Sequence, residues 1–279
     1  MKSIYLGFAL FFLNHTIMAQ SKGNYANVNG LRMYYEIHGE GFPLVLIHGG
    51  GSTLETTFGQ ILPVLAKKHR VIAVEMQAHG HTADIDRPLS FEQDADDIAE
   101  LLSQLRITQA DIFGFSNGAS TTLQIAIRHP KAVNKIIVAS TMYKKEGAFN
   151  GFWEMMKSAT FEGMPQPYKD AFIKINPDQK ALHAMYQRDV ARMQSFEDMN
   201  DNDIKNINSP ALILAGDKDV VRVEHAVEMF RMMKHAQLAI LPGGHGDYIG
   251  ELATRKPGVA EYPSVGIIEE FLASAPDKK

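Results

Sequence analysis

Short apolar runs alternate with longer amphipathic segments along most of this chain. The runs are the length of buried strands and are bounded by glycine or polar turns. They lie at residues 44–47, 71–75, 111–115, 134–139, 210–215 and 237–241. Segments with apolar residues at helical spacing lie at residues 53–67, 91–105, 118–129, 222–235 and 263–273. This alternation predicts an α/β fold in which a mostly parallel sheet carries helices on both faces.

Two stretches depart from the alternation. Residues 25–28 and 32–37 flank Asn29-Gly30, a strong turn signal, and predict an antiparallel hairpin ahead of the parallel sheet. Residues 142–206 hold half of the methionines and the only tryptophan. Apolar residues recur there at helical spacing, so we expect helices in this segment as well.

Composition agrees with one α/β domain and excludes several kinds of partner. A length of 279 residues and a hydrophobic content of 45% allow a sizeable core. The formal net charge is −4 and the lysine runs are short, so there is no basic patch of the kind that nucleic acid requires. Cysteine is absent and the histidines lack metal-site spacing, so we expect no disulfide, no metal ion and no cofactor.

The N-terminus has the anatomy of an export signal. Met1-Lys2 is a minimal positive region, residues 4–13 are an apolar stretch, and Ala19 precedes a cleavage site at Gln20. Such a short apolar run does not span a bilayer, so we expect no stable membrane anchor. We predict that residues 1–19 are a signal peptide and that the mature protein is periplasmic or secreted. The alternative is an uncleaved N-terminal anchor, or a strand packed on the core.

The candidate chemistry begins at Gly114-Phe115-Ser116-Asn117-Gly118, between a predicted strand and a predicted helix. A serine at so sharp a turn needs small residues two positions to either side, and Gly114 and Gly118 meet that need. The turn lifts the hydroxyl of Ser116 above the sheet and leaves the amide of Asn117 free to donate to an oxyanion. We therefore predict Ser116 as a nucleophile. The alternative, a glycine-flanked serine in an ordinary turn, is disfavoured by the strand and helix around it.

A nucleophilic serine needs a base, and the base needs an acid to orient it. One predicted strand runs into Gly216-Asp217-Lys218-Asp219, and the next runs into Pro242-Gly243-Gly244-His245. His245 follows a strand near the C-terminus and is the candidate base. Asp217 and Asp219 are both candidates for the acid. The loop histidines His79 and His81 could approach the site, but neither is needed.

The other histidines have weaker claims. His69, His129 and His235 lie near predicted helix C-termini, where a partial positive charge suits the helix dipole. His183 and His225 are expected on exposed helix faces. We assign none of them to the site.

The chain order of serine, aspartate and histidine is that of the α/β-hydrolase superfamily, which the chain resembles. The superfamily pattern after the acid-bearing strand is Gly-x-x-Asp. Gly216 to Asp219 match it, so the resemblance favours Asp219 and leaves Asp217 as a turn residue that caps backbone amides. The resemblance implies an α/β-hydrolase fold with a helical lid insertion.

His48-Gly49-Gly50-Gly51-Ser52 resembles the superfamily's His-Gly-Gly-Gly turn. Glycines let the backbone approach a substrate oxygen and expose its amides. The resemblance implies that the amide of Gly50 is the second oxyanion donor, with Gly51 as the alternative. A phosphate-binding loop is a weaker interpretation, because no Gly-Lys-Ser/Thr follows.

Residues 142–206 coincide with the place where the superfamily inserts its lid. The chain then divides into core at 20–141, lid at 142–206 and core at 207–279. Most apolar residues of the lid are expected to pack it onto the sheet. Methionine and aromatic surfaces also suit large apolar ligands, and the candidate substrate contacts are Phe152, Trp153, Met156 and Tyr186.

These features predict a serine hydrolase that cleaves a carboxylic ester or a lactone. His245 removes the proton of Ser116, the amides of Gly50 and Asn117 hold the oxyanion, and Asp219 orients the imidazole. The phrases around His48, His79 and His245 look similar to bacterial serine esterases that open the lactone ring of macrolide antibiotics. That similarity implies a bulky apolar substrate.

Other functions are compatible with the same triad. A perhydrolase or a carbon–carbon bond hydrolase would differ in what the lid binds, and a receptor-like member would bind a ligand with little turnover. Ser116 argues against haloalkane dehalogenases and epoxide hydrolases, which place an aspartate at the nucleophile position. The physiological substrate and the oligomeric state do not follow from the sequence.

Overall fold

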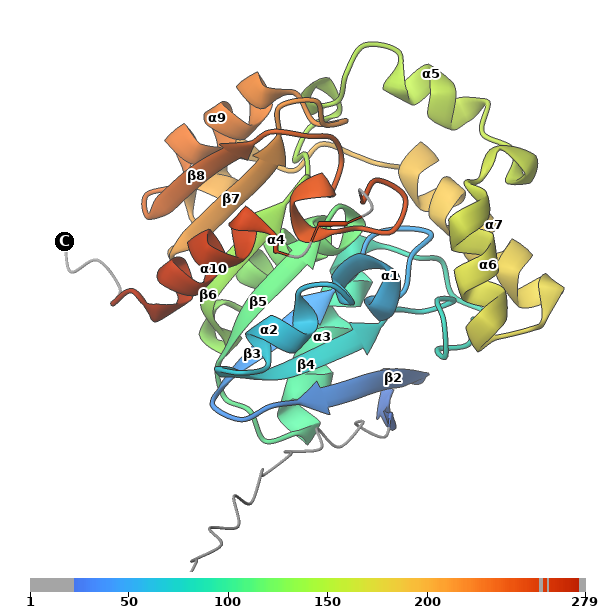
Figure 1. Ribbon diagram of the computed structural model, residues 1–279, viewed down its shortest axis with the longest axis horizontal. Coiled ribbons are helices and arrows are strands. Elements are labelled where there is room, and N and C mark those ends of the chain that lie inside the picture. The colour runs from blue at the N-terminus through green and yellow to red at the C-terminus, as the bar shows by residue number, and fades with distance from the viewer. Residues whose placement is uncertain (1–22, 256–257, 260, 276–279) are drawn as a thin grey trace, which may run out of the picture.

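The computed structural model describes residues 23–255, 258–259 and 261–275 (Figure 1). The predicted signal peptide lies outside these residues. Within them an eight-stranded sheet has the order β1-β2-β4-β3-β5-β6-β7-β8. Strands β3 to β8 are parallel, and β1 and β2 are antiparallel. The strands are β1 (Asn24–Val28), β2 (Leu31–His38), β3 (Phe42–Ile47), β4 (His69–Glu75), β5 (Ala110–Phe115), β6 (Val133–Ala139), β7 (Ala211–Gly216) and β8 (Ala236–Leu241).

Helices cover both faces of this sheet, as the sequence predicts. The α-helices are α1 (Leu54–Phe58), α2 (Leu62–Leu65), α3 (Phe91–Gln104), α4 (Asn117–Arg128), α5 (Phe152–Lys157), α6 (Gln166–Ile175), α7 (Gln179–Gln194), α8 (Asp201–Lys205), α9 (Val223–Met232) and α10 (Pro263–Ala273). The 3-10 turns are η1 (Pro130–Ala132), η2 (Lys145–Gly147), η3 (Phe161–Gly163) and η4 (Asp247–Ile249). Helices α3, α4 and α9 pack on one face, and α1, α2 and α10 pack on the other.

The central strands are buried on both sides because successive side chains point to opposite faces of a strand. In β3, Val45 and Ile47 join the core under α3 and α4, whereas Leu44 and Leu46 join the core under α1 and α10. Two apolar layers therefore clamp the sheet. This packing fixes the carboxyl ends of the parallel strands, and the loops that follow them can form a binding site there.

The predicted hairpin is confirmed. Val28 of β1 pairs with Leu31 of β2, and Asn29 and Gly30 between them have φ angles of 45° and 85°. Two successive residues at positive φ are what a two-residue hairpin turn requires, and asparagine and glycine adopt that conformation most readily. The hairpin adds the antiparallel edge of the sheet.

The structure corrects the single helix predicted over residues 53–67. Thr53 caps α1, accepting a hydrogen bond from the amide of Thr56, and α1 ends at Phe58 with Gly59 as its C-cap. Helix α2 starts afresh with Pro63 in its first turn. Proline has no N–H, and its ring would collide with the carbonyl of the residue four positions earlier, so a continuous helix cannot pass through Pro63.

The structure also corrects the exposed position expected for His225. Its side chain on α9 is 2% exposed, and its ring stacks on Tyr143 with a centroid distance of 4.5 Å. Nε2 of His225 accepts the amide hydrogen of Tyr143 at 3.2 Å. Burial lowers the pKa of His225. The histidine is a structural contact beneath the segment that leaves β6.

Helices α5 to α8 lie between β6 and β7 in the chain. In Figure 1, α5, α6 and α7 stand at the right of the view, apart from the sheet. Helices α6 and α7 share a small apolar cluster around Phe172, Leu182 and Met185. We call residues 142–206 the helical insert. None of the helices within the described residues has the length and apolar character needed to cross a membrane.

Candidate active site

Ser116 stands between the end of β5 and the start of α4, with φ 54° and ψ −120°. This is a conformation that side chains strongly disfavour. The backbone around it is tied down: the amide of Ser116 donates to Ala139 on β6 at 2.8 Å, and its carbonyl accepts from Ala119 at 2.9 Å. The turn therefore presents the Ser116 side chain at the edge of the sheet.

Gly114 and Gly118 make this turn possible. A Cβ on Gly114 would lie 2.1 Å from the carbonyl oxygen of Gly118, and a Cβ on Gly118 would lie 2.1 Å from the carbonyl oxygen of Ile47. No side chain fits at such distances. The spacing of the two glycines in the sequence thus reflects close approach of backbone on both sides of Ser116.

Three predicted residues meet at this edge. Nε2 of His245 lies 3.0 Å from Oγ of Ser116, and Nδ1 of His245 lies 2.7 Å from Oδ1 of Asp219. A carboxylate only accepts hydrogen bonds, so Nδ1 carries the ring proton. Nε2 of the neutral ring is then an acceptor that faces the Ser116 hydroxyl. Ser116, His245 and Asp219 form a continuous hydrogen-bonded chain, although they come from three different loops.

The carboxylate of Asp219 has further donors. Oδ1 also accepts from the amide of Val220 at 2.7 Å, and Oδ2 accepts from the amide of Gly216 at 3.1 Å. The hydroxyl of Ser140 donates to Oδ2 as well. Burial opposes ionisation, but the hydrogen bonds and charge of His245 and the hydrogen bond of Ser140 lower the pKa of Asp219 below its ordinary value. The group that faces His245 is therefore a carboxylate.

Asp217 has a different place, although it lies only two residues away. Its Oδ1 accepts the amide hydrogen of Gly243 at 2.8 Å, and its side chain is at the surface. It supports the turn that precedes His245. The geometry separates two aspartates that the sequence left as alternatives.

The glycine loop after β3 lies beside Ser116. The amides of Gly50 and Asn117 have no hydrogen-bond partner within the part of the chain that the structure describes, and both residues line a cavity with Ser116. The amide of Gly51 donates instead to Oδ2 of Asp189 on α7 at 2.5 Å. Gly51 is thus occupied, and Gly50 is the amide of this loop that is free to bind a ligand.

A cavity of about 640 Å³ opens above Ser116, between the sheet edge and the helical insert. That volume is in the range of sites for drug-sized ligands. Three of the candidate substrate contacts, Phe152, Met156 and Tyr186, line it together with other apolar side chains of the insert. Those additional side chains are Met142, Met155, Met164, Met193, Val190 and Phe196. No lysine or arginine is among the lining residues.

Trp153 does not line this cavity. Its Nε1 donates to the carbonyl oxygen of Lys145 at 2.7 Å, and its ring packs on Phe196 with a centroid distance of 5.3 Å. Phe196 in turn lines the cavity. The structure therefore places Trp153 behind the wall, where it supports a lining residue.

A part-buried hydrogen bond joins the helical insert to the loop after His245. The hydroxyl of Tyr168 on α6 donates to Oε1 of Glu251 at 2.7 Å, and Oε2 of Glu251 accepts from the amide of Ala253 at 2.9 Å. Glu251 is 1% exposed, and burial raises its pKa. A Cβ built on Gly246, the residue after His245, would lie only 2.6 Å from the Cβ of Glu251.

His48 and His79 lie behind the glycine loop, with ring centroids 4.8 Å apart. Nδ1 of His48 donates to the carbonyl oxygen of Gly49 at 2.7 Å, while Nε2 accepts from the amide of Met76 at 3.1 Å. This pattern requires a neutral ring. Burial and the neighbouring His79 lower the pKa of His48 to about 3. Neither histidine reaches Ser116.

The comparisons with known proteins agree with this architecture. A model of the alpha/beta hydrolase fold matches residues 43–171. Serine hydrolase BPHL of Homo sapiens is 29% identical over 238 residues, which cover 78% of this chain and 77% of that protein. The chain is also 24% identical over 240 residues to 2-hydroxy-6-oxo-6-(2'-aminophenyl)hexa-2,4-dienoic acid hydrolase of Metapseudomonas resinovorans, covering 78% of this chain and 82% of that protein.

Solved structures share the fold. The crystal structure of a serine hydrolase involved in carbazole degradation has a TM-score of 0.71 at 22% identity, over 90% of this chain and 98% of that one. This chain has the α/β-hydrolase fold. Its eight-stranded, mostly parallel sheet is the sheet of the α/β-hydrolase fold.

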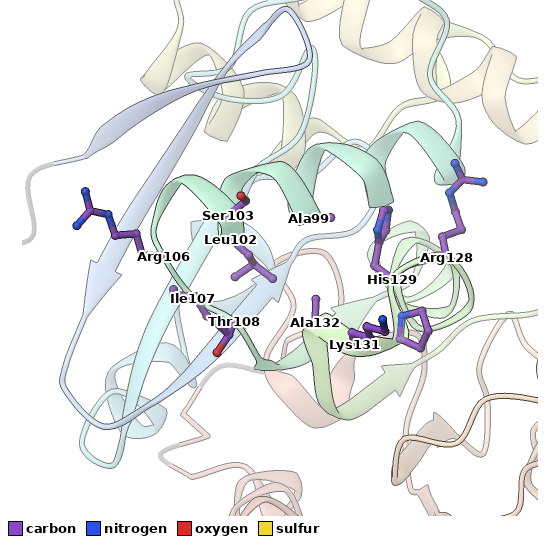
Figure 2. Close-up of a pocket in the computed structure, with 11 residues that line it drawn as sticks. Ala99, Leu102, Ser103, Arg106, Ile107, Thr108, Arg128, His129, Lys131 and Ala132 are labelled. Atoms are coloured by element: carbon purple, nitrogen blue, oxygen red, sulfur yellow. The ribbon is translucent and has the colours of Figure 1, made fainter.

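A second pocket, of about 720 Å³, lies at the opposite edge of this α/β-hydrolase sheet (Figure 2). Ala99 and Leu102 of α3 border it, with residues 106–108 before β5 and 128–132 before β6. Arg128 is paired with Asp96, each nitrogen–oxygen contact being at most 3.0 Å. Open α/β sheets bind ligands at the carboxyl ends of their strands, and this pocket is at the amino ends. The cavity above Ser116 is therefore the candidate site.

No group of three histidine, cysteine or acidic side chains within the described residues is arranged to hold a metal ion. The site that this α/β hydrolase presents consists of a serine, an imidazole, a carboxylate and backbone amides. That set is sufficient for acyl transfer without another group.

Sequence reasoning missed Ser140, Asp189 and Glu251. Ser140 has a φ of 53°, and no turn motif around it signals that conformation. Asp189 contacts Gly51 across 138 residues, and Glu251 contacts Tyr168 across 83. Local periodicity carries no information about such pairs. A covariation between distant positions would be the signal that reveals them.

Proposed function

We propose that this α/β hydrolase is a serine hydrolase that transfers the acyl group of a carboxylic ester or lactone to water. The observation that carries the proposal is the alignment of Ser116, His245 and Asp219, with contacts of 3.0 Å and 2.7 Å. Nucleophile, base and orienting acid at these distances are the constellation of a catalytic triad. The free amides of Gly50 and Asn117 supply the oxyanion hole.

The chemistry follows from these positions. Nε2 of His245 takes the proton of Ser116, and Oγ attacks the carbonyl carbon of the ester. The carbonyl oxygen becomes an oxyanion between the amides of Gly50 and Asn117. When the intermediate collapses, the leaving alkoxide takes the proton from His245, and the acyl group stays on Ser116. Water, deprotonated by His245, then releases the acid and restores the hydroxyl.

The cavity supports a large, apolar and uncharged acyl group or ring. Flexible methionine side chains adapt to irregular ligands, and several of them line it. In a lactone the alcohol remains attached to the acyl group, so the product is one opened hydroxy acid that carries an added water. A macrolide fits this description, as the resemblance of the His48 and His245 phrases suggests.

The second candidate is hydrolysis of a carbon–carbon bond, since one relative is named a dienoic acid hydrolase. That substrate is a carboxylic acid. Proteins commonly hold a substrate carboxylate with arginine or lysine, and the residues that line this cavity include neither. The composition of the wall therefore favours a neutral ester or lactone over an acid.

The test uses three substrates and two proteins. The purified protein and its Ser116→Ala variant are incubated with a short p-nitrophenyl ester, a macrolide lactone and a dienoic acid, and products are identified by mass. We expect the ester to be hydrolysed and the lactone to gain the mass of one water, both only with Ser116 present. Cleavage of the dienoic acid alone would favour the second candidate. Binding of a ligand without turnover would leave the receptor-like function.

A further inference from the structure

Asp189 joins two loops of the core to a helix of the insert. It lies on α7 and is 8% exposed. Its Oδ2 accepts from the amide of Gly51 at 2.5 Å and from Nε2 of His79 at 2.8 Å, and its Oδ1 accepts from Arg192 at 2.5 Å. One carboxylate thus connects the glycine loop after β3, the loop after β4 and α7.

The charges of these groups follow from their partners. Nδ1 of His79 faces the carbonyl oxygen of Gln77 at 2.8 Å, and Nε2 faces the Asp189 carboxylate. Both oxygens only accept, so both nitrogens donate and His79 is an imidazolium. Burial opposes that charge, but the charge and hydrogen bond of Asp189 raise the pKa of His79. Despite burial, His79 and Arg192 hold the pKa of Asp189 well below its usual range.

The cluster is electrically balanced. Arg192 also donates to Oδ2 of Asp94 on α3 at 2.8 Å. Two carboxylates, Asp94 and Asp189, therefore face two cations, His79 and Arg192, away from solvent. Removing one member of such a buried set leaves a charge without a partner, which is strongly unfavourable. Asp189 is consequently held in one place, and the Gly51 amide with it.

We propose that Asp189 is a positioning residue for the oxyanion hole, an inference that rests on the proposed function. Gly51 follows Gly50 directly and has a φ of 66°, and three successive glycines have little conformational preference of their own. A donor to the transition state must be held within about 0.5 Å, and misplacement by about 1 Å can cost about 100-fold in rate. The bond from Gly51 to Asp189 supplies that constraint. The helical insert, and not only the core, then sets the oxyanion hole.

The experiment compares Asp189→Ala, Asp189→Asn and the control Asp97→Asn on a p-nitrophenyl ester. Asp189→Ala removes the acceptor of Gly51, and we expect kcat to fall by about 10-fold to 100-fold with KM changed less than about threefold, because only the transition state uses the donors fully. Asp189→Asn keeps one acceptor oxygen for Gly51, so its kcat falls between. Asp97→Asn breaks the buried ion pair of Arg87 and Asp97, which includes neither Asp189 nor the glycine loop, and should keep kcat within about threefold at a comparable loss of Tm.

A second measurement isolates the oxyanion. A trifluoromethyl ketone adds to Ser116 and places an anionic oxygen where the transition state places one. Its inhibition constant should rise in Asp189→Ala, or in Asp189→Asn if the alanine variant does not fold, by the factor that kcat falls. Equal losses of kcat in Asp189→Asn and Asp97→Asn, or an unchanged inhibition constant, would overturn the assignment. A wild-type protein without hydrolysis or ketone binding would overturn the proposed function and this inference with it.

Discussion

The hydroxyl of Ser140 donates to Oδ2 of Asp219, the carboxylate oxygen that does not contact His245. Ser140 also contacts the hydroxyl of Tyr248 at 2.6 Å, and its backbone has a φ of 53°. A residue that directly follows β6 therefore helps to fix an acid that follows β7. The acid is held from both sides, by the imidazole and by this hydroxyl.

Replacing Ser140 by glycine tests that support, because glycine accepts the positive φ and lacks the side chain whose hydroxyl donates to Asp219. The pKa of Asp219 is lower in the folded protein than in the unfolded chain. Its charge therefore stabilises the fold at a pH above the ordinary carboxyl pKa, and this stabilisation is lost as pH falls through the folded pKa. In Ser140→Gly the pKa of Asp219 rises toward the ordinary carboxyl value, so less stability is lost on acidification below that value. We expect a loss of about 1.5–3 kcal/mol in unfolding free energy at neutral pH. An unchanged loss of stability on acidification would show that Ser140 does not support Asp219.

Gly118→Ala is expected to destabilise the protein by more than about 2 kcal/mol, because the new methyl would overlap the carbonyl of Ile47. Gly266→Ala on α10 is the matched control. A Cβ there meets nothing within 4 Å, and alanine in a helix gains about 0.5–1 kcal/mol over glycine. Thermal unfolding of both variants measures the contrast. Similar Tm values for the two would contradict the steric account of the turn.

The buried His48 makes the fold less stable as pH falls. Its folded pKa of about 3 lies below its unfolded value, so the unfolded chain binds the extra proton as pH falls. Stability from this group is complete above the unfolded pKa of about 6.5 and decreases by about 1.4 kcal/mol per pH unit below it. His48→Gln can keep both hydrogen bonds without titrating. Asp94, whose pKa burial raises to about 6, contributes the opposite slope.

The measurement is therefore the difference between wild type and His48→Gln in urea unfolding at several pH values. Between about pH 6 and pH 4 the wild type should lose about 1.4 kcal/mol per unit more than the variant. Asp94 is present in both proteins and cancels. Parallel pH profiles would mean that His48 becomes an imidazolium in the folded protein as readily as in the unfolded chain.

Tyr168→Phe removes the hydroxyl that donates to the buried Glu251. An unsatisfied buried acceptor costs about 1–3 kcal/mol, so Tm falls. Burial raises the pKa of Glu251 in the folded protein above its value in the unfolded chain. Glu251 therefore contributes stability that is fully present below the unfolded pKa and is lost as pH rises through the folded pKa. The loss in Tyr168→Phe should therefore be larger at pH 7 than at pH 4. A double-mutant cycle with Glu251→Gln gives the coupling, which should be about 0.5–3 kcal/mol.

Local features of the fold could be predicted from the sequence because each depends on neighbours in the chain. The strands, the Asn29-Gly30 turn and the glycines around Ser116 are of this kind. Helix α2 was harder, since apolar spacing continues across Gly59 and Pro63 while the backbone does not. A period in the sequence reports which face is apolar, but not where hydrogen bonding stops.

The three candidate catalytic residues and their order in the chain could be predicted from the sequence, whereas the residues that hold them in place could not. Ser116 and His245 each follow a strand in a distinctive local phrase. Asp219 and Asp217 share one turn, so the residues alone left both open, and the Gly-x-x-Asp resemblance favoured Asp219. Asp189 had no local signal, because a carboxylate on a helix is most often a solvated residue. Its partners come from loops that the sheet brings together.

The backbone conformation of Ser116 lowers the stability of the fold at the same position where the proposed reaction needs a side-chain hydroxyl. Glycine adopts a φ of 54° with a ψ of −120° without strain, whereas any other residue in this conformation destabilises the fold by about 1–3 kcal/mol. Ser116→Gly should therefore abolish hydrolysis and raise Tm, whereas Ser116→Ala should abolish hydrolysis and keep the strain. A protein that had to do nothing but fold would have no use for a serine in this turn.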